Sequence, residues 1–345
     1  MPQHLQAGGM PPHQEEPPGA SDVLVATEGP RRPSNLRSPE KSVPTRALLI
    51  VNDKSRSGPA NIDAGIDRLR GRGIEIIEGR AEGPDRIAAL IHEHRGNVDC
   101  VIIGGGDGSM NAAASALVET QLPLGVLPMG TANDLARTLN IPTDIEQAFD
   151  IIADGIAHRI DLGSVNGRYF FNVANIGLGV HVMRHMSPDL KRRWGIFSYA
   201  RSLIKAIGSF RPFHAEIVCD GRPRRVRTIQ IAVGNGRHYG GGMTVSERAS
   251  IDDDRFFLYN LEPLSIWQML RLAPAFRTGR FESLDPVDLD HGRSIDIKTR
   301  KPMPVTADGE LITTTPARFK LLPGAISVFV PAGYFENKEE LIHAA

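Results

Sequence analysis

The stretch IIGGGDGSMN, residues 102–111, follows the apolar run VDCV and places four glycines and one aspartate where a strand is predicted to end. A tight turn needs glycine only where φ is positive, and it rarely needs four of them. The absence of side chains also exposes consecutive backbone N–H groups at the start of the next helix, which suits the oxygens of a phosphate. The stretch indicates an anion-binding loop, and a plain strand-to-helix turn remains the alternative.

The spacing of this loop excludes two familiar nucleotide-binding motifs. The dinucleotide fingerprint G-x-G-x-x-G requires a glycine three positions after Gly106, where Ser109 stands. The Walker loop requires Gly-Lys followed by Ser or Thr, and the sequence contains no Gly-Lys pair. Asp107 would repel a phosphate unless a Mg²⁺ bridges the two or a neighbouring donor contacts its carboxylate.

The segments around the loop alternate between predicted strands and predicted helices. Apolar runs typical of buried strands occupy residues 46–52, 74–78, 98–103 and 122–128. After each run the apolar residues are spaced as on one face of a helix, which predicts, among others, a helix over residues 109–119 and another from about Ala132. This alternation predicts a parallel sheet covered on both faces, with its site at the carboxyl ends of the strands.

The pattern changes after about residue 155 to short strands. Asn166-Gly167 and Asp220-Gly221 are typical hairpin turns between strand-like runs, so the second half is predicted to be mostly antiparallel β. Residues 1–44 are rich in proline and poor in large apolar side chains, which predicts a disordered extension. The predicted organisation is an α/β domain over residues 45–158 and a β-rich domain over 159–335, whose last strand either stays there or returns to the first domain. A short tail, 336–345, follows.

The composition excludes several classes of protein. The formal net charge is +0, so no global charge favours nucleic acid. Cys100 and Cys219 are too few for a disulfide framework or a cysteine metal site. No apolar run is long enough to span a membrane, and the N-terminus lacks the layout of a secretory signal. We therefore expect a cytoplasmic protein that contacts the inner face of the membrane only peripherally.

A second glycine loop, LPMGTANDLAR at residues 127–137, follows the next predicted strand. Gly130 and Thr131 are predicted to open a helix, with Asn133 and Asp134 in its first turn. An ordinary N-cap would explain this loop alone, with Thr131 as the cap and Asp134 complementing the helix dipole. Two such loops on successive strand ends could face each other across one phosphate site.

Together the two loops resemble the diacylglycerol-kinase catalytic family, in particular its small bacterial lipid kinases. The family carries G-G-D-G-T and then P-x-G-T-x-N-D-x-A-R, and this chain has GGDGS at 105–109 and PMGTANDLAR at 128–137. VNDKSRSG at 51–58 is similar to the opening loop N-P-x-S-x-x-G, with Asp53 in place of the proline. ADGE at 307–310 is similar to a late D-G-E element, and the likeness extends from about residue 46 to 335.

The resemblance implies an NAD-kinase-like three-layer α/β/α domain followed by a β-sandwich-like domain, with ATP and Mg²⁺ in a cleft between them. It assigns nucleotide binding to residues of the three loops, namely Asn52, Lys54, Ser55, Gly58, Gly105, Gly106, Asp107, Gly108, Ser109, Asn111, Gly130, Thr131, Asn133 and Asp134. The implied catalytic residues are Glu310, the base for the lipid hydroxyl, Asp308, which supports it, and Asp107, which with Asp134 organises phosphate and Mg²⁺.

The resemblance also implies a second, structural Mg²⁺ site, which the family forms in a segment L-x-x-D-G-x-L. Its counterpart here is IDDDRF at 251–256, with Asp254 and the carbonyls of Ile251 and Phe256 as ligands. Arg255 replaces the glycine of the family. A backbone that needs positive φ at this position would be strained, and a cation would lie beside the metal.

The implied activity is that of an ATP-dependent lipid kinase, with diacylglycerol as the first candidate acceptor and phosphatidic acid as the product. A sphingoid base or another glycerolipid, a soluble NAD kinase, and an inactive lipid- or nucleotide-binding protein are the alternatives. PMGTANDLAR speaks against an NAD kinase. The oligomeric state is left open, a homodimer included.

Two basic segments bear on membrane contact. Residues 189–213 combine basic and aromatic side chains, so this segment could lie on a membrane as an amphipathic helix or pack on the β-rich domain. A group of arginines near the second hairpin turn is expected to be solvated, with anionic headgroups as the alternative partner: Arg222, Arg224, Arg225 and Arg227.

Overall fold

Four parallel strands in the order β3-β2-β4-β5 form the sheet of the first half of the chain. The strands are β2 (Arg46–Asn52), β3 (Glu75–Ala81), β4 (Cys100–Gly105) and β5 (Leu124–Pro128). β4 and β5 are buried along their whole length, which explains why their sequences are continuous apolar runs rather than alternating ones. The carboxyl ends of these two strands carry the two glycine loops.

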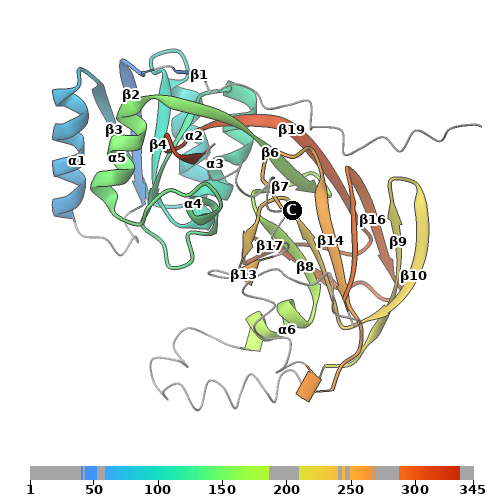
Figure 1. Cartoon of the computed structure of the whole chain (residues 1–345). Helices are drawn as coiled ribbons and strands as arrows, with labels where there is room; N and C mark the ends of the chain where they lie inside the picture. The colour runs from blue at the N-terminus through green and yellow to red at the C-terminus, as the bar shows by residue number, and fades with distance from the viewer. Residues whose placement is uncertain are drawn as a thin grey trace, which may run out of the picture. The chain divides into compact units, whose positions relative to one another are not determined.

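Helices cover both faces of this sheet, as Figure 1 shows, with α1 and α5 packed together on one face and α2 and α3 on the other. They are α1 (Pro59–Gly71), α2 (Pro84–His94), α3 (Asp107–Thr120) and α5 (Ile145–Asp154). The predicted faces are buried: Ile62, Ile66 and Leu69 on α1, and Ile87, Leu90 and Ile91 on α2. The predicted three-layer α/β/α arrangement is confirmed.

The computed structural model describes residues 40–41, 43–52, 59–185, 210–239, 243–244, 249–265, 267–268 and 287–334. All of them belong to one unit of the chain, residues 37–345. Several predictions lie outside the described residues: the extension before residue 40, the contacts of Lys54, Ser55 and Gly58, the basic aromatic segment from 186 to 209, and the tail from 336.

The second half consists mainly of strands. They are β6 (Ile156–Val165), β7 (Arg168–Phe170), β8 (Val173–Gly177), β9 (Phe213–Cys219), β10 (Arg222–Thr228), β11 (Gln230–Gly234), β12 (His238–Tyr239), β13 (Met243–Thr244), β14 (Phe256–Leu261), β15 (Val287–Gly292), β16 (Ser294–Thr299), β17 (Pro304–Ala307), β18 (Glu310–Thr314) and β19 (Ala317–Phe329). α6 (Leu178–His185) follows β8. Both predicted hairpins are confirmed: β6 pairs with β7 and β9 with β10. All four turn residues have positive φ, as two-residue hairpin turns of this kind require: Asn166, Gly167, Asp220 and Gly221.

Two sheets pack face to face in this half. One has the order β15-β14-β11-β8-β17-β18, and the other includes β10-β9-β16-β19. The core between them contains side chains from both sheets, among them Phe170, Phe256 and Phe319. The rings of Phe170 and Phe256 are stacked with centroids 6.0 Å apart, and Phe319 meets Phe170 edge-on at 6.3 Å. The predicted β-sandwich is confirmed.

The last strand joins the sheets of the two halves. β19 pairs antiparallel with β16 and β6, and near its end Val328 pairs with Leu124 of β5 in parallel. β3, β2, β4 and β5 therefore continue into β19, β16, β9 and β10 as one sheet.

One strand lies in the segment that the sequence assigns to a disordered extension. Glu40 and Lys41 form β1 and pair with Ala157 and Ile156 at the start of β6. The sequence predicts a later start of ordered structure because a strand of two residues has no hydrophobic pattern. Such a strand is recognised only by its backbone pairing with another strand, here β6. Within the part of the chain that the structure describes, no helix is long and apolar enough to cross a membrane.

Candidate active site

The two glycine loops are in direct backbone contact. Gly105 pairs with Pro128 at the ends of β4 and β5, and the N–H of Met129 donates to the carbonyl of Gly105 at 3.0 Å. A Cβ atom on Gly130 would lie 2.4 Å from the Cα of Gly106, which is closer than any real contact. Glycine is therefore required at this crossing, because any side chain would push the two loops apart.

Asn133 shapes the second loop. Its side-chain Oδ1 accepts the N–H of Gly130 at 2.9 Å, and its Nδ2 donates to the carbonyls of Pro128 and Gly130 at 3.3 and 3.2 Å. Asn133 is buried, and its backbone has the left-handed conformation, with φ of 51°. The helix α4 (Asp134–Thr138) begins after it, with Asn133 at the cap and no side-chain cap bond. The helix begins two residues later than the predicted start near Ala132, and Thr131, the cap of the alternative interpretation, is not its cap, because the Asn133 side chain bonds back to close the loop.

Asp107 connects the loops at the start of α3. That helix begins at Asp107, two residues earlier than predicted, and its cap residue Gly106 provides no side-chain bond to the first amides. The carboxylate Oδ1 of Asp107 accepts the N–H of Leu135 at 3.1 Å. The aspartate that would repel a phosphate therefore has a donor from the second loop, one of the two arrangements that the sequence leaves open.

Glu310 lies against the first turn of α3. A Cβ atom on Gly108 would be 2.8 Å from Oε1 of Glu310, so this carboxylate lies close beside the helix backbone at Gly108. Glu310 itself is exposed and begins β18, immediately after the turn formed by Asp308 and Gly309. The D-G-E segment is thus a hairpin turn, and it also brings an acid to the glycine loop.

Three backbone amides clamp Asp308. Its carboxylate accepts the N–H groups of Phe171, Asn172 and Val173 at 2.7, 2.9 and 3.1 Å. Burial raises the pKa of Asp308 to about 6, the three amides act in the opposite direction, and the charge of Asp107 adds a smaller rise. The residue is partly exposed, but its carboxylate is enclosed by these amides, and we expect it to be ionised at neutral pH. Asp308 thereby fixes the turn that carries Glu310.

The remaining predicted loop residues differ in what they contact. Ser109 is buried in the first turn of α3. Asn111, two residues further along, has a buried Oδ1 atom without a hydrogen-bond partner. An unsatisfied buried oxygen is unusual and is consistent with a ligand donor at this position. Asn52 ends β2, and Thr131 lies in the second loop.

At the predicted structural Mg²⁺ site, Asp254 and the carbonyl of Ile251 have protein partners. The guanidinium of Arg293 donates from Nη2 to Oδ2 of Asp254 at 3.0 Å and from Nε to the carbonyl of Asp254 at 2.9 Å. The carbonyl of Ile251 accepts the N–H of Asp161 at 2.7 Å. Phe256 of β14 pairs with Gly292 of β15. Among the described residues, no group of three or more His, Cys, Asp or Glu side chains is placed to hold a metal ion. A protein cation therefore pairs with one oxygen of the carboxylate that the metal would use.

Arg255 does not have the strain that its sequence position suggests. The left-handed residue is Asp254, with φ of 60°, and its N–H donates to Oδ2 of Asp161 at 2.8 Å. Arg255 points elsewhere: its Nε is 3.4 Å from the Asp253 carboxylate, and its guanidinium lies over the ring of Phe257 at 5.2 Å. The expected positive φ at position 255 is therefore corrected to position 254, where aspartate tolerates it.

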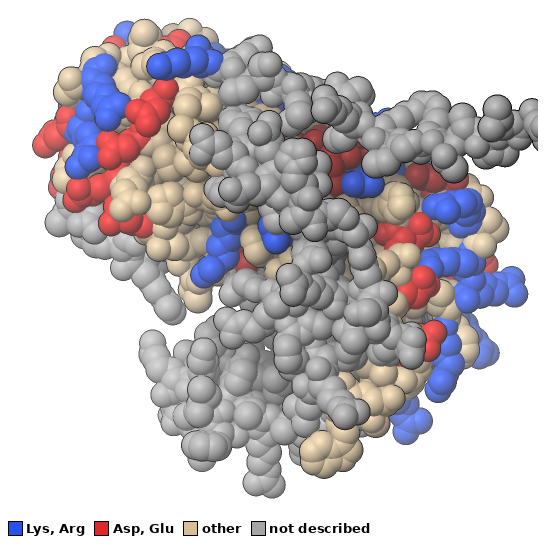
Figure 2. Space-filling view, in the orientation of Figure 1, with Lys and Arg blue, Asp and Glu red and all other residues tan. Residues whose placement is uncertain are grey.

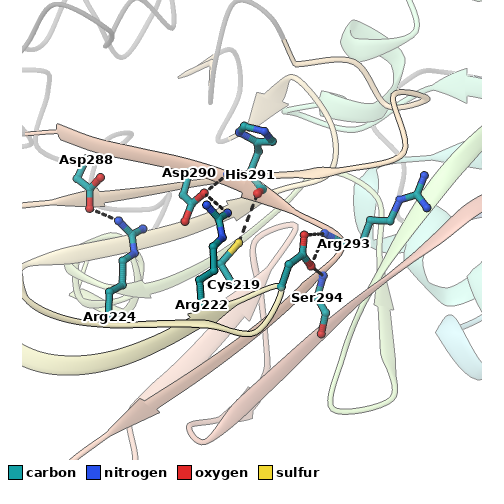
Figure 3. A network of polar contacts seen from close by, with 9 residues as sticks. Cys219, Arg222, Arg224, Asp288, Asp290, His291, Arg293 and Ser294 are labelled. Carbon is teal, nitrogen blue, oxygen red and sulfur yellow. Dashed lines mark hydrogen bonds and ion pairs between the residues drawn. The ribbon is translucent and has the colours of Figure 1, made fainter. Parts of the chain in front are cut away.

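Most of the arginines near the second hairpin turn have acidic partners, as Figure 3 shows for Arg222 and Arg224. Arg222 lies 3.1 Å from Asp290, Arg224 pairs with Asp288, and Arg225 is 3.8 Å from Glu216. In Figure 2, basic and acidic side chains are intermixed over this part of the surface, at the right. The charges are largely balanced locally, which does not favour this hairpin as an anion-binding surface.

Two open cavities, of about 490 and 470 Å³, lie on the outer face of the sheet formed by β10, β9, β16 and β19. Lys298 borders both cavities, and neither contains a predicted site residue. The predicted site residues therefore do not line either of these two cavities.

Sequence reasoning missed several residues beside the site. Asn172 connects Asp308 to α4, because its N–H donates to Asp308 and its Oδ1 accepts the hydroxyl of Thr138 at 3.2 Å. His238 donates its N–H to Thr138 at 3.3 Å. The sequence shows only polar residues after strand-like runs at these positions, and their proximity arises from contacts between distant segments.

Comparisons with known proteins agree with this architecture. A family model described as "Diacylglycerol kinase catalytic domain" matches residues 46–165, and one described as "YegS C-terminal NAD kinase beta sandwich-like domain" matches 172–330. The chain belongs to the diacylglycerol-kinase catalytic-domain family.

Curated relatives and a solved structure extend the match over most of the chain. A protein of Pseudomonas savastanoi pv. phaseolicola named "Probable lipid kinase YegS-like" is 32% identical over 306 residues, covering 83% of this chain and 94% of the relative. A Mycobacterium tuberculosis protein named "Diacylglycerol kinase" is 31% identical over 301 residues, covering 83% of this chain and 95% of that protein. The crystal structure of a diacylglycerol kinase from Bacillus anthracis has the same fold, with a TM-score of 0.71 at 23% identity, covering 85% of this chain and 99% of that one.

Proposed function

We propose that this chain is an ATP- and Mg²⁺-dependent lipid kinase that phosphorylates a hydroxyl of a membrane lipid, with diacylglycerol as the first candidate and phosphatidic acid as its product. The observation that carries the proposal is the position of the exposed carboxylate of Glu310 close beside Gly108, in the first turn of α3. A carboxylate at the start of an uncapped, glycine-rich helix can receive a proton beside a bound phosphate.

The residues present fit a nucleotide phosphate. The first turn of α3 has no side-chain cap, and the crossing of Gly106 and Gly130 leaves backbone without side chains beside it. The unsatisfied Oδ1 of Asn111 is an acceptor, so it suits a hydroxyl or amino group of the nucleotide rather than its phosphate oxygens. Membership of a kinase family implies ATP use, and ATP with Mg²⁺ supplies the transferable phosphoryl group and neutralises its charge. We infer that residues 105–111 and 130–134 hold the phosphates.

A catalytic Mg²⁺ needs fewer protein ligands than a structural one. Such ions commonly bind one or two carboxylates together with substrate phosphates. Asp107 uses one oxygen for the N–H of Leu135 and lies beside the second loop, and Asp134 is buried in the first turn of α4. We assign the ion to these two aspartates.

The contacts of the three acids support the roles that we propose for them. Glu310 receives the proton of the lipid hydroxyl, and Asp308 orients the turn that carries it through three amides. Asp107 positions the two loops relative to each other through Leu135. Phosphoryl transfer depends mainly on positioning and charge neutralisation, which is what this arrangement of acids and amides can provide.

The acceptor is proposed to be a lipid because of the relatives' names and the second loop. A sphingoid base or another glycerolipid remains an alternative acceptor, and NAD is the alternative that a soluble kinase of similar fold would use. We propose that the protein reaches its lipid by peripheral contact with the membrane, as expected for a chain without a predicted spanning segment.

A direct test supplies the protein with labelled ATP, Mg²⁺ and a panel of lipids in mixed micelles, with NAD in a separate reaction. Label in diacylglycerol supports the proposal, label in a sphingoid base changes the acceptor, and label in NAD alone refutes the lipid kinase. Glu310→Gln should reduce turnover by about 100-fold or more. Glu119→Gln, an exposed acid at the opposite end of α3, is the matched control and should leave turnover unchanged.

A further inference from the structure

Three basic side chains gather beside the proposed active site, and we call them the Arg237 cluster: Arg137, Arg237 and His238. Arg137 lies in α4, and His238 begins β12 just after Arg237. The N–H of His238 donates to the hydroxyl of Thr138, the neighbour of Arg137, at 3.3 Å. Helix α4 and strand β12 also contact each other, which places the three residues in one locality.

The Arg237 cluster lacks the acidic partners that other arginines have. Nε of Arg237 and Nδ1 of His238 are buried without a hydrogen-bond partner. Arg137 donates Nε to the carbonyl of Ala132 at 3.0 Å, and no ion pair to Arg137 or Arg237 is found within the described ranges. By contrast, Arg68 and Arg222 have carboxylates at 2.7 and 3.1 Å. A partly buried guanidinium without an anion is unfavourable, so the site is suited to an anionic ligand.

Asn172 places this cluster next to the catalytic turn. Its N–H donates to Asp308, while its Oδ1 accepts the hydroxyl of Thr138. Its carbonyl accepts the N–H groups of Asn235 and Gly236 at 2.7 and 3.0 Å. The residue that helps to orient Asp308 therefore also fixes the backbone from which Arg237 and His238 project.

The backbone before Arg237 is tightly constrained. A Cβ atom on Gly236 would lie 2.7 Å from Oδ1 of Asn172. Asn235 donates its side-chain Nδ2 to the carbonyls of Asp161 and Phe171 at 3.0 and 2.7 Å. Because the segment before Arg237 is held at several points, the backbone that carries Arg237 is ordered before any ligand binds, which lowers the entropy that binding must overcome.

We propose that Arg137, Arg237 and His238 form a phosphate-binding subsite of the active site. Guanidinium groups bind phosphate oxygens through charge-assisted hydrogen bonds, often in pairs, and a histidine N–H adds a further donor. The phosphate belongs either to ATP or to the phosphorylated lipid, and this choice rests on the proposed function. Burial, with the charges of Arg237 and then Arg137, lowers the pKa of His238 to about 4, so the imidazole is neutral at neutral pH and donates one N–H.

The test measures binding rather than turnover, by calorimetry on the full chain. The two probes are ATP with Mg²⁺ and a short-chain phosphatidate, and the variants are Arg237→Gln, Arg237→Lys and Arg137→Gln. Arg237→Gln should weaken the binding affinity for one of the two probes by about 10- to 100-fold, the loss expected for charge-assisted hydrogen bonds. Arg237→Lys should retain part of the affinity. Arg300→Gln, an exposed arginine after β16, is the matched control and should bind like the wild type.

The two probes separate the two sources of the phosphate. Loss of ATP binding alone assigns the subsite to the nucleotide, and loss of phosphatidate binding alone assigns it to the lipid product. If Arg237→Gln does not fold, as judged by circular dichroism, Arg237→Lys and Arg137→Gln carry the test. Wild-type affinity for both probes in every folded variant overturns the proposal.

The outcome also distinguishes this inference from the proposed function. Arg237-dependent binding of ATP by a protein that labels no lipid would leave the subsite in place and refute the lipid kinase. Unchanged lipid phosphorylation by Arg237→Gln, together with unchanged binding of both probes, would refute the subsite and leave the lipid kinase in place.

Discussion

Glu310 has an exposed carboxylate, yet its position depends on a residue that has no side chain. Because Oε1 lies so near the backbone of Gly108, a methyl group there would come within 2.8 Å of it. Glu310 can move outward, since β18 is exposed at this end. Gly108→Ala is therefore expected to displace the acid with little loss of stability.

The prediction for Gly108→Ala is a fall in kcat of roughly 10- to 100-fold, the cost of displacing a catalytic group by about an ångström. The melting temperature should change little. Gly96→Ala is the control, because a Cβ atom there meets nothing within 4 Å. Normal turnover by Gly108→Ala would show that Glu310 need not contact α3.

His238 makes the stability of the protein depend on pH. Its pKa in the folded state is about 4, below its ordinary value of 6.5, because of burial and the two neighbouring arginines. Between these values the unfolded chain binds a proton that the folded chain does not. The stability that the neutral His238 side chain contributes is fully present above pH 6.5 and is lost as the pH falls toward 4.

We therefore expect His238→Gln to be less sensitive to acid than the wild type over this window. Denaturant unfolding at pH 7 and pH 5 measures the two free energies of unfolding for each protein. The wild type should lose more of this free energy between the two pH values than the variant does. Equal losses would mean that the imidazole is not held neutral.

At the scale of elements, the loop at 251–256 is closed by an arginine from another part of the chain. Arg293 precedes β16, and its own N–H donates to the carboxylate of Asp220 at 3.0 Å in the β9–β10 turn. Its side chain extends away from the Arg222 and Arg224 pairs (Figure 3) and reaches Asp254. One residue thus connects two turns and the loop without a metal.

Metal removal should consequently leave the free protein unchanged. Without nucleotide, the melting temperature should be the same in excess EDTA and in millimolar Mg²⁺, because an ion that binds the folded state would raise it. Arg293→Ala should lower the free energy of unfolding by about 1 kcal/mol, the upper range for an exposed ion pair. Arg300→Ala is the control. A rise in the wild-type melting temperature with Mg²⁺ alone would contradict the replacement of the ion by Arg293.

Elements with a local signal were predictable, and those formed by distant partners were not. β4 and β5 are continuous apolar runs, and the glycines after them mark where backbones must touch. α4 was misplaced because the side chain of Asn133 bonds backward to Gly130, which no periodicity shows. The pairing of Arg293 with Asp254 spans 39 residues, so sequence spacing could not suggest it.

The same distinction applies to the candidate site. Its loops and its D-G-E turn carry glycines and acids whose chemistry can be read one segment at a time. The contacts of Asn172 with Asp308 and Thr138 join three separate segments. The Arg237 cluster follows from those contacts, and only the folded chain reveals that its arginines have no acidic partner among the described residues.

For the whole molecule, β19 makes the two halves depend on each other. It pairs with β5 at Val328 and with β6 and β16 along its length, and its buried side chains belong to both main cores. A chain whose halves share a strand is expected to unfold in one cooperative transition, because opening either half exposes apolar surface of the other.

Val328→Ala tests this coupling. The side chain is fully buried at the junction with β5, so its truncation should lower the free energy of unfolding by about 2 kcal/mol. Hydrogen exchange of peptides from β4, in the first half, and β14, in the second, should then accelerate by the same factor, because both open only when the shared sheet opens. Faster exchange in β4 with unchanged exchange in β14 would show instead that the halves unfold separately, and that β19 belongs energetically to the sandwich alone.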